Sequence, residues 1–164
     1  REALIESLEE VEVITGKTGK RRAKWSRIKP MLKEKYLDSA LNLKALKNKI
    51  YYRVFEDSLL YQDLTTIVIA KAINRYIEQA EIKKYKATIL IDGLEKNQAG
   101  KVSKSLRELG VKIRKVRGLR DESSAIIRLA DSLAGFIREA DEDNNKFRML
   151  KKTLEKEKII SELS

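Results

Sequence analysis

Apolar residues recur along this chain at two spacings, one helical and one typical of strands. The clearest helix covers residues 61–80, where Leu64, Ile67 and Val68 begin an apolar face that repeats every three or four positions. Runs of β-branched and aromatic residues bounded by turn residues indicate strands. The pattern predicts helices over residues 2–9, 25–41, 61–80, 96–109, 123–140 and 146–163, and strands over residues 11–15, 49–55, 87–92 and 111–116.

The order of these elements favours an α/β fold with a partly parallel sheet. Residues 87–92 are apolar up to their last position, as in a strand buried on both faces, so we expect a central place for this strand. Residues 111–116 alternate apolar with cationic side chains, as a protected edge strand does. No linker or repeat divides the sequence, so we expect a single domain over residues 1–164 that ends in a helix over residues 146–164.

The charge balance indicates a polyanionic partner. The chain has 36 Lys and Arg against 25 Asp and Glu, which gives a formal net charge of +11. We expect nucleic acid first and an acidic membrane surface second, with a charged surface that serves only solubility as the alternative. No apolar stretch approaches the roughly 20 residues that cross a bilayer, and no signal-peptide pattern is present. We therefore expect nucleic acid rather than a membrane as the partner, and a cytoplasmic location.

The chain contains no cysteine and no histidine. A disulfide framework and a zinc site built on thiolates or imidazoles are thereby excluded. A thiol nucleophile and a Ser-His-Asp triad are excluded for the same reason. Side-chain chemistry at a site therefore depends mainly on carboxylates and cations.

Three aspartates are candidate catalytic residues and metal ligands. Asp92 closes the strand of residues 87–92, and open α/β sheets carry their chemistry at the C-terminal ends of strands. Asp121 precedes the next helix, and Asp131 lies within it. Each has a structural alternative: Asp92 shapes a turn, Asp121 caps the helix, and Asp131 pairs with an arginine. Together they suggest a divalent cation that acts on a nucleic-acid phosphate.

A helical wheel predicts that Asp131 lies at the border of an apolar face. Ile126, Ala130, Leu133 and Ile137 centre this face of the helix over residues 123–140. A short carboxylate at such a border can lie close to a sheet and point along its rim.

Basic residues gather in two groups that are candidates for contact with phosphates. The first group occupies a loop and the start of the following helix, with Trp25 beside it. Trp25 can stack on a base, but a half-buried core position is the more common role for such a tryptophan. The candidate nucleic-acid-binding residues are Lys17, Lys20, Arg21, Arg22, Lys24, Lys112, Arg114, Arg117 and Arg120.

The run Asp121-Glu-Ser-Ser-Ala-Ile-Ile-Arg-Leu-Ala-Asp131 and its continuation to Arg138 resemble the closing motif of a known family. This is the family numbered 3800 among the domains of unknown function, which has an RNase H-like fold. The stretch Ile89-Leu-Ile-Asp92 resembles the fourth strand of that family, which also ends in an aspartate. The resemblance covers roughly residues 11–142. In this chain Arg128 stands where the family usually has glutamine.

The resemblance implies an RNase H-like mixed sheet flanked by helices, with Asp92, Asp121 and Asp131 as the acidic positions of a metal-dependent nuclease. With oxygen ligands alone, the ion is expected to be Mg²⁺ or Mn²⁺ rather than zinc. The family also opens with a strand that ends in Asp-Glu-Ser-Gly, and these 164 residues contain no such motif. We therefore expect the first strands to be missing at the N-terminus, or the chain to be a divergent member with an incomplete site.

Two functions remain open from the sequence. The first is a nuclease that hydrolyses phosphodiester bonds with divalent metal ions. The second is a non-catalytic module that binds nucleic acid or protein and retains a degenerate site. If the first strands are missing, the exposed sheet edges also favour strand exchange with a second copy, which would give a homodimer.

Overall fold

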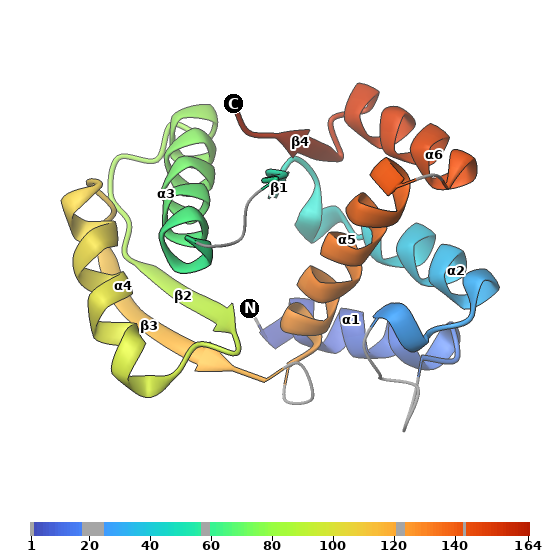
Figure 1. The fold of residues 1–164 in the computed structure, drawn as a ribbon, viewed down its shortest axis with the longest axis horizontal. Helices are drawn as coiled ribbons and strands as arrows, with labels where there is room; N and C mark the ends of the chain where they lie inside the picture. Colours follow the sequence, from blue (N-terminus) through green and yellow to red (C-terminus); the bar gives the residue numbers. More distant parts are fainter. Residues whose placement is uncertain (1, 18–24, 57–59, 121–123, 143) are drawn as a thin grey trace. The chain divides into compact units, whose positions relative to one another are not determined.

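The computed structural model describes residues 2–17, 25–56, 60–120, 124–142 and 144–164. These residues form two compact units. Unit 1 comprises Arg1–Ile50 and Arg120–Ser161, and unit 2 comprises Tyr51–Leu119 and Glu162–Ser164. Helices and short strands alternate along the chain, so the predicted α/β class is confirmed (Figure 1). No helix in the described ranges combines the length and apolar character needed to cross a membrane.

Unit 2 is built around a parallel β–α–β arrangement. Its elements are β1 (Ile50–Tyr52, which begins at the boundary residue), α3 (Tyr61–Gln79), β2 (Ala87–Asp92), α4 (Lys96–Glu108) and β3 (Ile113–Leu119). Strands β2 and β3 pair in parallel, and α4 makes the connection between them (Figure 1). The carboxyl ends of both strands therefore lie at the same edge of the sheet.

One face of this sheet packs against both helices. Ile89 and Ile91 from β2 form a buried cluster with Ala70 of α3 and with Val102 and Leu106 of α4. At 25 cal/mol per Å² of buried apolar area, each aliphatic side chain of this kind stabilises the fold by about 1.5–3 kcal/mol. Apolar contacts with α3 and α4 therefore stabilise the sheet on one face.

Position 118 of β3 requires glycine, because the backbone of Leu94 lies close to it. A Cβ atom at this position would lie 1.7 Å from the Leu94 carbonyl oxygen. Every residue other than glycine would push the β2–α4 loop away from the sheet. The loop that follows Asp92 is therefore held tightly against β3.

Unit 1 is mainly helical. Its elements are α1 (Glu2–Ile14), η2 (Trp25–Arg27), α2 (Pro30–Leu41), η3 (Lys44–Leu46), α5 (Ala125–Glu142) and α6 (Asn145–Lys156). Leu8 and Val11 of α1, Tyr36 of α2 and Leu129 of α5 meet in one core. Trp25 is buried, so its core role is the one observed.

The predicted strand over residues 11–15 is wrong, because α1 continues to Ile14. Alternation of Val11 and Val13 imitates a strand, but Val11, Glu12 and Thr15 are buried together and Val13 is exposed. This spacing is that of one helical face. The Thr15 hydroxyl also donates to the Val11 carbonyl at 2.6 Å, which closes the end of the helix.

The predicted C-terminal helix is too long. α6 ends at Lys156, and β4 (Ile160–Glu162) follows and pairs with β1. Lys158 adopts a φ of 58°, and the Ile159 N–H donates to the Leu154 carbonyl at 2.9 Å. These are the features of a Schellman helix end, which usually contains glycine. A lysine in the left-handed position gives no such signal in the sequence.

The buried face of α5 is rotated from the predicted one. Ala130, expected at the centre of the apolar face, is exposed, while Arg128 and Ser132 are buried together with Phe136. Polar side chains with partners inside the unit occupy this face. A wheel based on hydrophobicity alone does not anticipate them.

Candidate functional site

Asp92 is the last residue of β2, at the carboxyl end of the parallel pair. The chain turns there through Gly93, which has a φ of 65°, a conformation that glycine adopts without strain. The Gly93 N–H donates to the Leu119 carbonyl at 3.0 Å and thus continues the pairing with β3. Asp92 is exposed at this end of the sheet.

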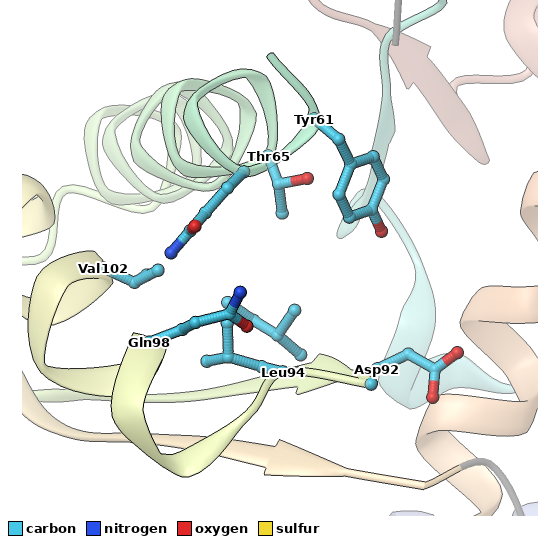
Figure 2. A pocket seen from close by; sticks show the side chains of 9 residues that line it. Tyr61, Thr65, Asp92, Leu94, Gln98 and Val102 are labelled. Carbon is cyan, nitrogen blue, oxygen red and sulfur yellow. The ribbon is translucent and has the colours of Figure 1, made fainter. Parts of the chain in front are cut away.

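A small pocket of about 80 Å³ lies beside Asp92. Its polar lining includes Tyr61, Gln62, Thr65, Asp92 and Gln98. In Figure 2, the Tyr61 ring and the Asp92 carboxylate lie on the same side of the pocket, and Val102 lies on the other. The volume corresponds to a few water molecules, at about 30 Å³ each, and is below the 300–1,000 Å³ of common small-molecule sites.

Both helices of unit 2 contribute their first turns to this pocket. Tyr61 begins α3, and Gln98 lies in the first turn of α4. The Gln98 side-chain oxygen accepts the Glu95 backbone N–H at 3.1 Å, which fixes the start of α4. The sequence prediction did not identify Tyr61, Gln62, Thr65 or Gln98. Polar residues are common in the first turn of a helix, so they do not indicate a site in the sequence. They line a pocket here because the fold brings two such turns to the end of one strand.

The basic candidates of unit 2 are on the surface. Lys112, Arg114 and Arg117 are exposed, as contact with phosphates requires. Arg114 lies at the register shift between Ala87 and Thr88 of the β2–β3 pairing, so it has no direct partner in β2. These three residues keep the role that the sequence predicts, which stays a prediction.

Asp131 has a structural partner within unit 1. Its Oδ2 accepts the Trp25 backbone N–H at 3.1 Å and thereby holds the start of η2 against α5. The Trp25 indole N–H donates to Glu139 Oε1 at 2.8 Å, so two carboxylates of α5 fix this tryptophan. The sequence alternative of an arginine partner for Asp131 is replaced by a backbone amide.

Lys17 differs from the expected phosphate contact because it is buried. It has 2% of its surface exposed, and its Nζ donates to Ser132 Oγ at 2.8 Å. The same ammonium lies 3.9 Å from the centroid of the Tyr36 ring, a cation–π contact. An aromatic face and a hydroxyl thus stabilise the charge inside unit 1, and the expectation that Lys17 reaches a phosphate is wrong.

Arg128 and Glu12 form a buried ion pair beside Lys17. Arg128 donates from Nε and Nη2 to the two Glu12 oxygens at 2.7 Å and 2.8 Å. These hydrogen bonds raise the pKa of Arg128 above its ordinary value. Removing one partner of such a pair leaves a buried charge uncompensated. Arg128, the position where the resembled family has glutamine, therefore connects α5 to α1.

Asp121, Lys20, Arg21, Arg22 and Lys24 lie outside the described residues. Arg120 is exposed at the beginning of the second segment of unit 1.

The carboxylate oxygens of Asp92 are donors of the kind that Mg²⁺ and Mn²⁺ prefer. Among the described residues, however, no three acidic side chains gather into a group able to hold a metal ion. Asp92 belongs to unit 2 and Asp131 to unit 1. The oxygen atoms of Asp92 are therefore suitable ligands for such a metal ion. A site for two ions would require further carboxylates.

In comparisons with known proteins, no family model matches the chain, and no significant match was found among the curated proteins or the solved structures. The function is therefore inferred from the chain's own residues and geometry.

Proposed function

We propose that this chain is an RNase H-like nuclease that cleaves nucleic-acid phosphodiester bonds with divalent metal ions. The position of Asp92 carries the proposal. Asp92 is exposed at the carboxyl end of a parallel strand and lies beside a pocket. Open α/β sheets bind and transform ligands at this end of their strands. In this proposal Asp92 supplies oxygen ligands at the carboxyl end of β2. Bound Mg²⁺ or Mn²⁺ would activate a water molecule and stabilise the leaving oxygen.

The positive charge of the chain supports a nucleic-acid substrate. The formal net charge is +11, and Lys112, Arg114 and Arg117 are exposed in unit 2. Cations of this kind bind the phosphate backbone without reading the base sequence. We place this activity in the cytoplasm. Strand exchange between two copies is a further element of the proposal, since β2 and β3 each have one neighbouring strand in the described sheet.

One observation favours the second function, a binding module without catalysis. The Asp131 carboxylate accepts the Trp25 N–H, so it serves the core of unit 1. If Asp131 stabilises Trp25 and does not bind a metal ion, the chain would bind nucleic acid or a protein partner through its basic surface without cleaving it. The two functions differ in whether the chain responds to a metal ion at Asp92.

Thermal unfolding with and without Mn²⁺ tests the proposal. A tenfold excess of Mn²⁺ over its dissociation constant stabilises the fold by about 1.4 kcal/mol and raises the Tm by about 3–6 °C. The substitution Asp92→Asn should remove this increase. The matched control is Glu78→Gln, an exposed carboxylate in the last turn of α3, away from the pocket, and it should leave the increase intact.

Cleavage of labelled single-stranded and duplex substrates is measured on the same proteins. We expect little or no cleavage by these 164 residues, because misplacement of reacting groups by about 1 Å costs about 100-fold in rate and the family's opening aspartate is not in the sequence. Strong cleavage that Asp92→Asn abolishes would support the nuclease and contradict the incomplete site. If Mn²⁺ neither stabilises the chain nor supports cleavage, the nuclease proposal fails and the binding module is the remaining function.

A further inference from the structure

The two faces of the β2–β3 sheet differ in chemistry. Ile89 of β2 pairs with Val116 of β3, and both belong to the cluster that packs against α3 and α4. Because successive side chains alternate between faces, the neighbouring positions lie on the opposite face. There Thr88 pairs with Lys115, and the next pair is Leu90 with Arg117.

Two cations on this second face lead toward Asp92. Lys115 and Arg117 are both exposed, and they are two residues apart on one strand, which is about 6.6 Å. The next position of the partner strand on this face is Asp92, which pairs with Leu119. A row of two cations thus ends at the carboxylate proposed to act on a phosphodiester. Successive phosphates of an extended nucleic-acid strand can contact such a row.

An exposed aromatic side chain lies at the same strand end. Tyr61 is 64% exposed, although its ring could contribute to a core. It lines the pocket together with Asp92 and lies on the Asp92 side of it in Figure 2. Tyr61 is on the helix side of the sheet, because α3 packs on the face of Ile89 and Val116, whereas the two cations are on the opposite face. A strand that follows the cations past Asp92 reaches the ring across the strand end, and any base can stack on an aromatic face.

We propose that unit 2 binds single-stranded nucleic acid, with phosphates on Lys115 and Arg117 and an unpaired base stacked on Tyr61. The inference rests on the proposed function, because it names the substrate form that reaches Asp92. A base in a duplex is already stacked and paired, so Tyr61 contributes to binding only when the base is unpaired. Charge complementarity identifies the partner as a polyanion, and the ring selects a nucleic acid over other polyanions.

The test is a binding measurement in EDTA, so that it does not depend on metal or cleavage. Fluorescence anisotropy with a labelled 12-nucleotide single strand, as DNA and as RNA, is compared with a hairpin duplex of equal charge. The full chain should bind at least one single strand more tightly than the duplex. Tyr61→Ala should weaken single-strand binding by about 5- to 100-fold, and Tyr61→Phe, which keeps the ring, by less than twofold.

The cations are tested with a charge-matched control. The double variant Lys115→Ala/Arg117→Ala should weaken binding and reduce the salt slope of log K by about 1.4, because each single-strand phosphate contact contributes about 0.7. Lys83→Ala/Lys84→Ala removes two exposed cations from the loop before β2 and should leave the single-strand preference unchanged. Circular dichroism melts confirm that the variants fold.

Tighter binding to the duplex, or unchanged binding by Tyr61→Ala, would overturn this inference. Equal affinity for vesicles that contain anionic lipid would do so as well, since a membrane surface would then explain the charge. The outcomes separate the two proposals. Loss of the Mn²⁺ response with intact single-strand binding rejects the nuclease alone, whereas duplex preference with an intact Mn²⁺ response rejects only the substrate form.

Discussion

Tyr36 carries a hydroxyl group that is buried without a hydrogen-bond partner among the described residues. Burial, with a contribution from nearby Glu12, raises the pKa of this phenol above its ordinary value of about 10. A buried donor that makes no hydrogen bond costs about 1–3 kcal/mol of desolvation. The ring is nevertheless retained in the core and lies under the Lys17 ammonium.

We predict that Tyr36→Phe keeps the ring contacts and leaves the chain as stable at pH 7 as the wild type, or more stable. The effect should grow at alkaline pH. Because the folded pKa is raised, the stability that the neutral phenol contributes is present below pH 10 and falls as pH rises above it. Urea unfolding at pH 7, 9 and 10.5 measures this difference, with Tyr61→Phe as the exposed control. A larger loss of stability in the variant than in the wild type at high pH would contradict it.

Among the helices, α5 depends on a glycine that lies against Trp25. A Cβ atom at Gly135 would lie 2.2 Å from the Trp25 ring. We predict that Gly135→Ala destabilises the chain by about 1–3 kcal/mol, because the buried tryptophan has to move. Gly100→Ala in α4 is the matched control, with nothing within 4 Å of the new methyl group, and it should stabilise by about 0.5–1 kcal/mol. Chemical denaturation measures both, and equal effects of the two substitutions would reject the packing argument.

Strong local signals made several elements predictable. The bounds of β2 agree with the apolar run, and α4 ends before Gly110, where the stop was expected. The error at α5 occurred because its polar side chains have partners far away in sequence. Arg128 and Ser132 lie on the buried face of α5, because Arg128 pairs with Glu12 and Ser132 accepts a hydrogen bond from Lys17 inside unit 1. Such pairs, 115 or more residues apart, leave no trace in local periodicity.

For the whole molecule, the charge of +11 predicts binding to nucleic acid that depends on salt. Contact with about four phosphates of a single strand gives a slope of log K against log salt of roughly −3, because counterions are released on binding. Anisotropy titrations between 50 and 300 mM NaCl measure this slope. Binding that is absent at low salt, or that does not change with salt, would exclude a phosphate-based interaction.

The candidate site was predictable in part. Asp92 was identified from its place after an apolar strand, and the structure locates it beside a pocket. Tyr61 could not be identified, because only the fold brings the start of α3 to the end of β2. Lys17 was misjudged, because a lysine next to other cations resembles a surface residue until Ser132 and Tyr36 enclose it.

The central claim is that the carboxyl end of β2 binds a divalent metal through Asp92. Mn²⁺ is paramagnetic and broadens NMR signals near its binding site, so ¹⁵N–¹H spectra with substoichiometric Mn²⁺ test the claim most directly. The account predicts that the amide signals of Gly93 and Leu94 broaden first, and that Asp92→Asn removes this effect while Glu78→Gln does not. Signals at Gly93 and Leu94 that stay sharp, or that broaden equally in the Asp92→Asn protein, would contradict it.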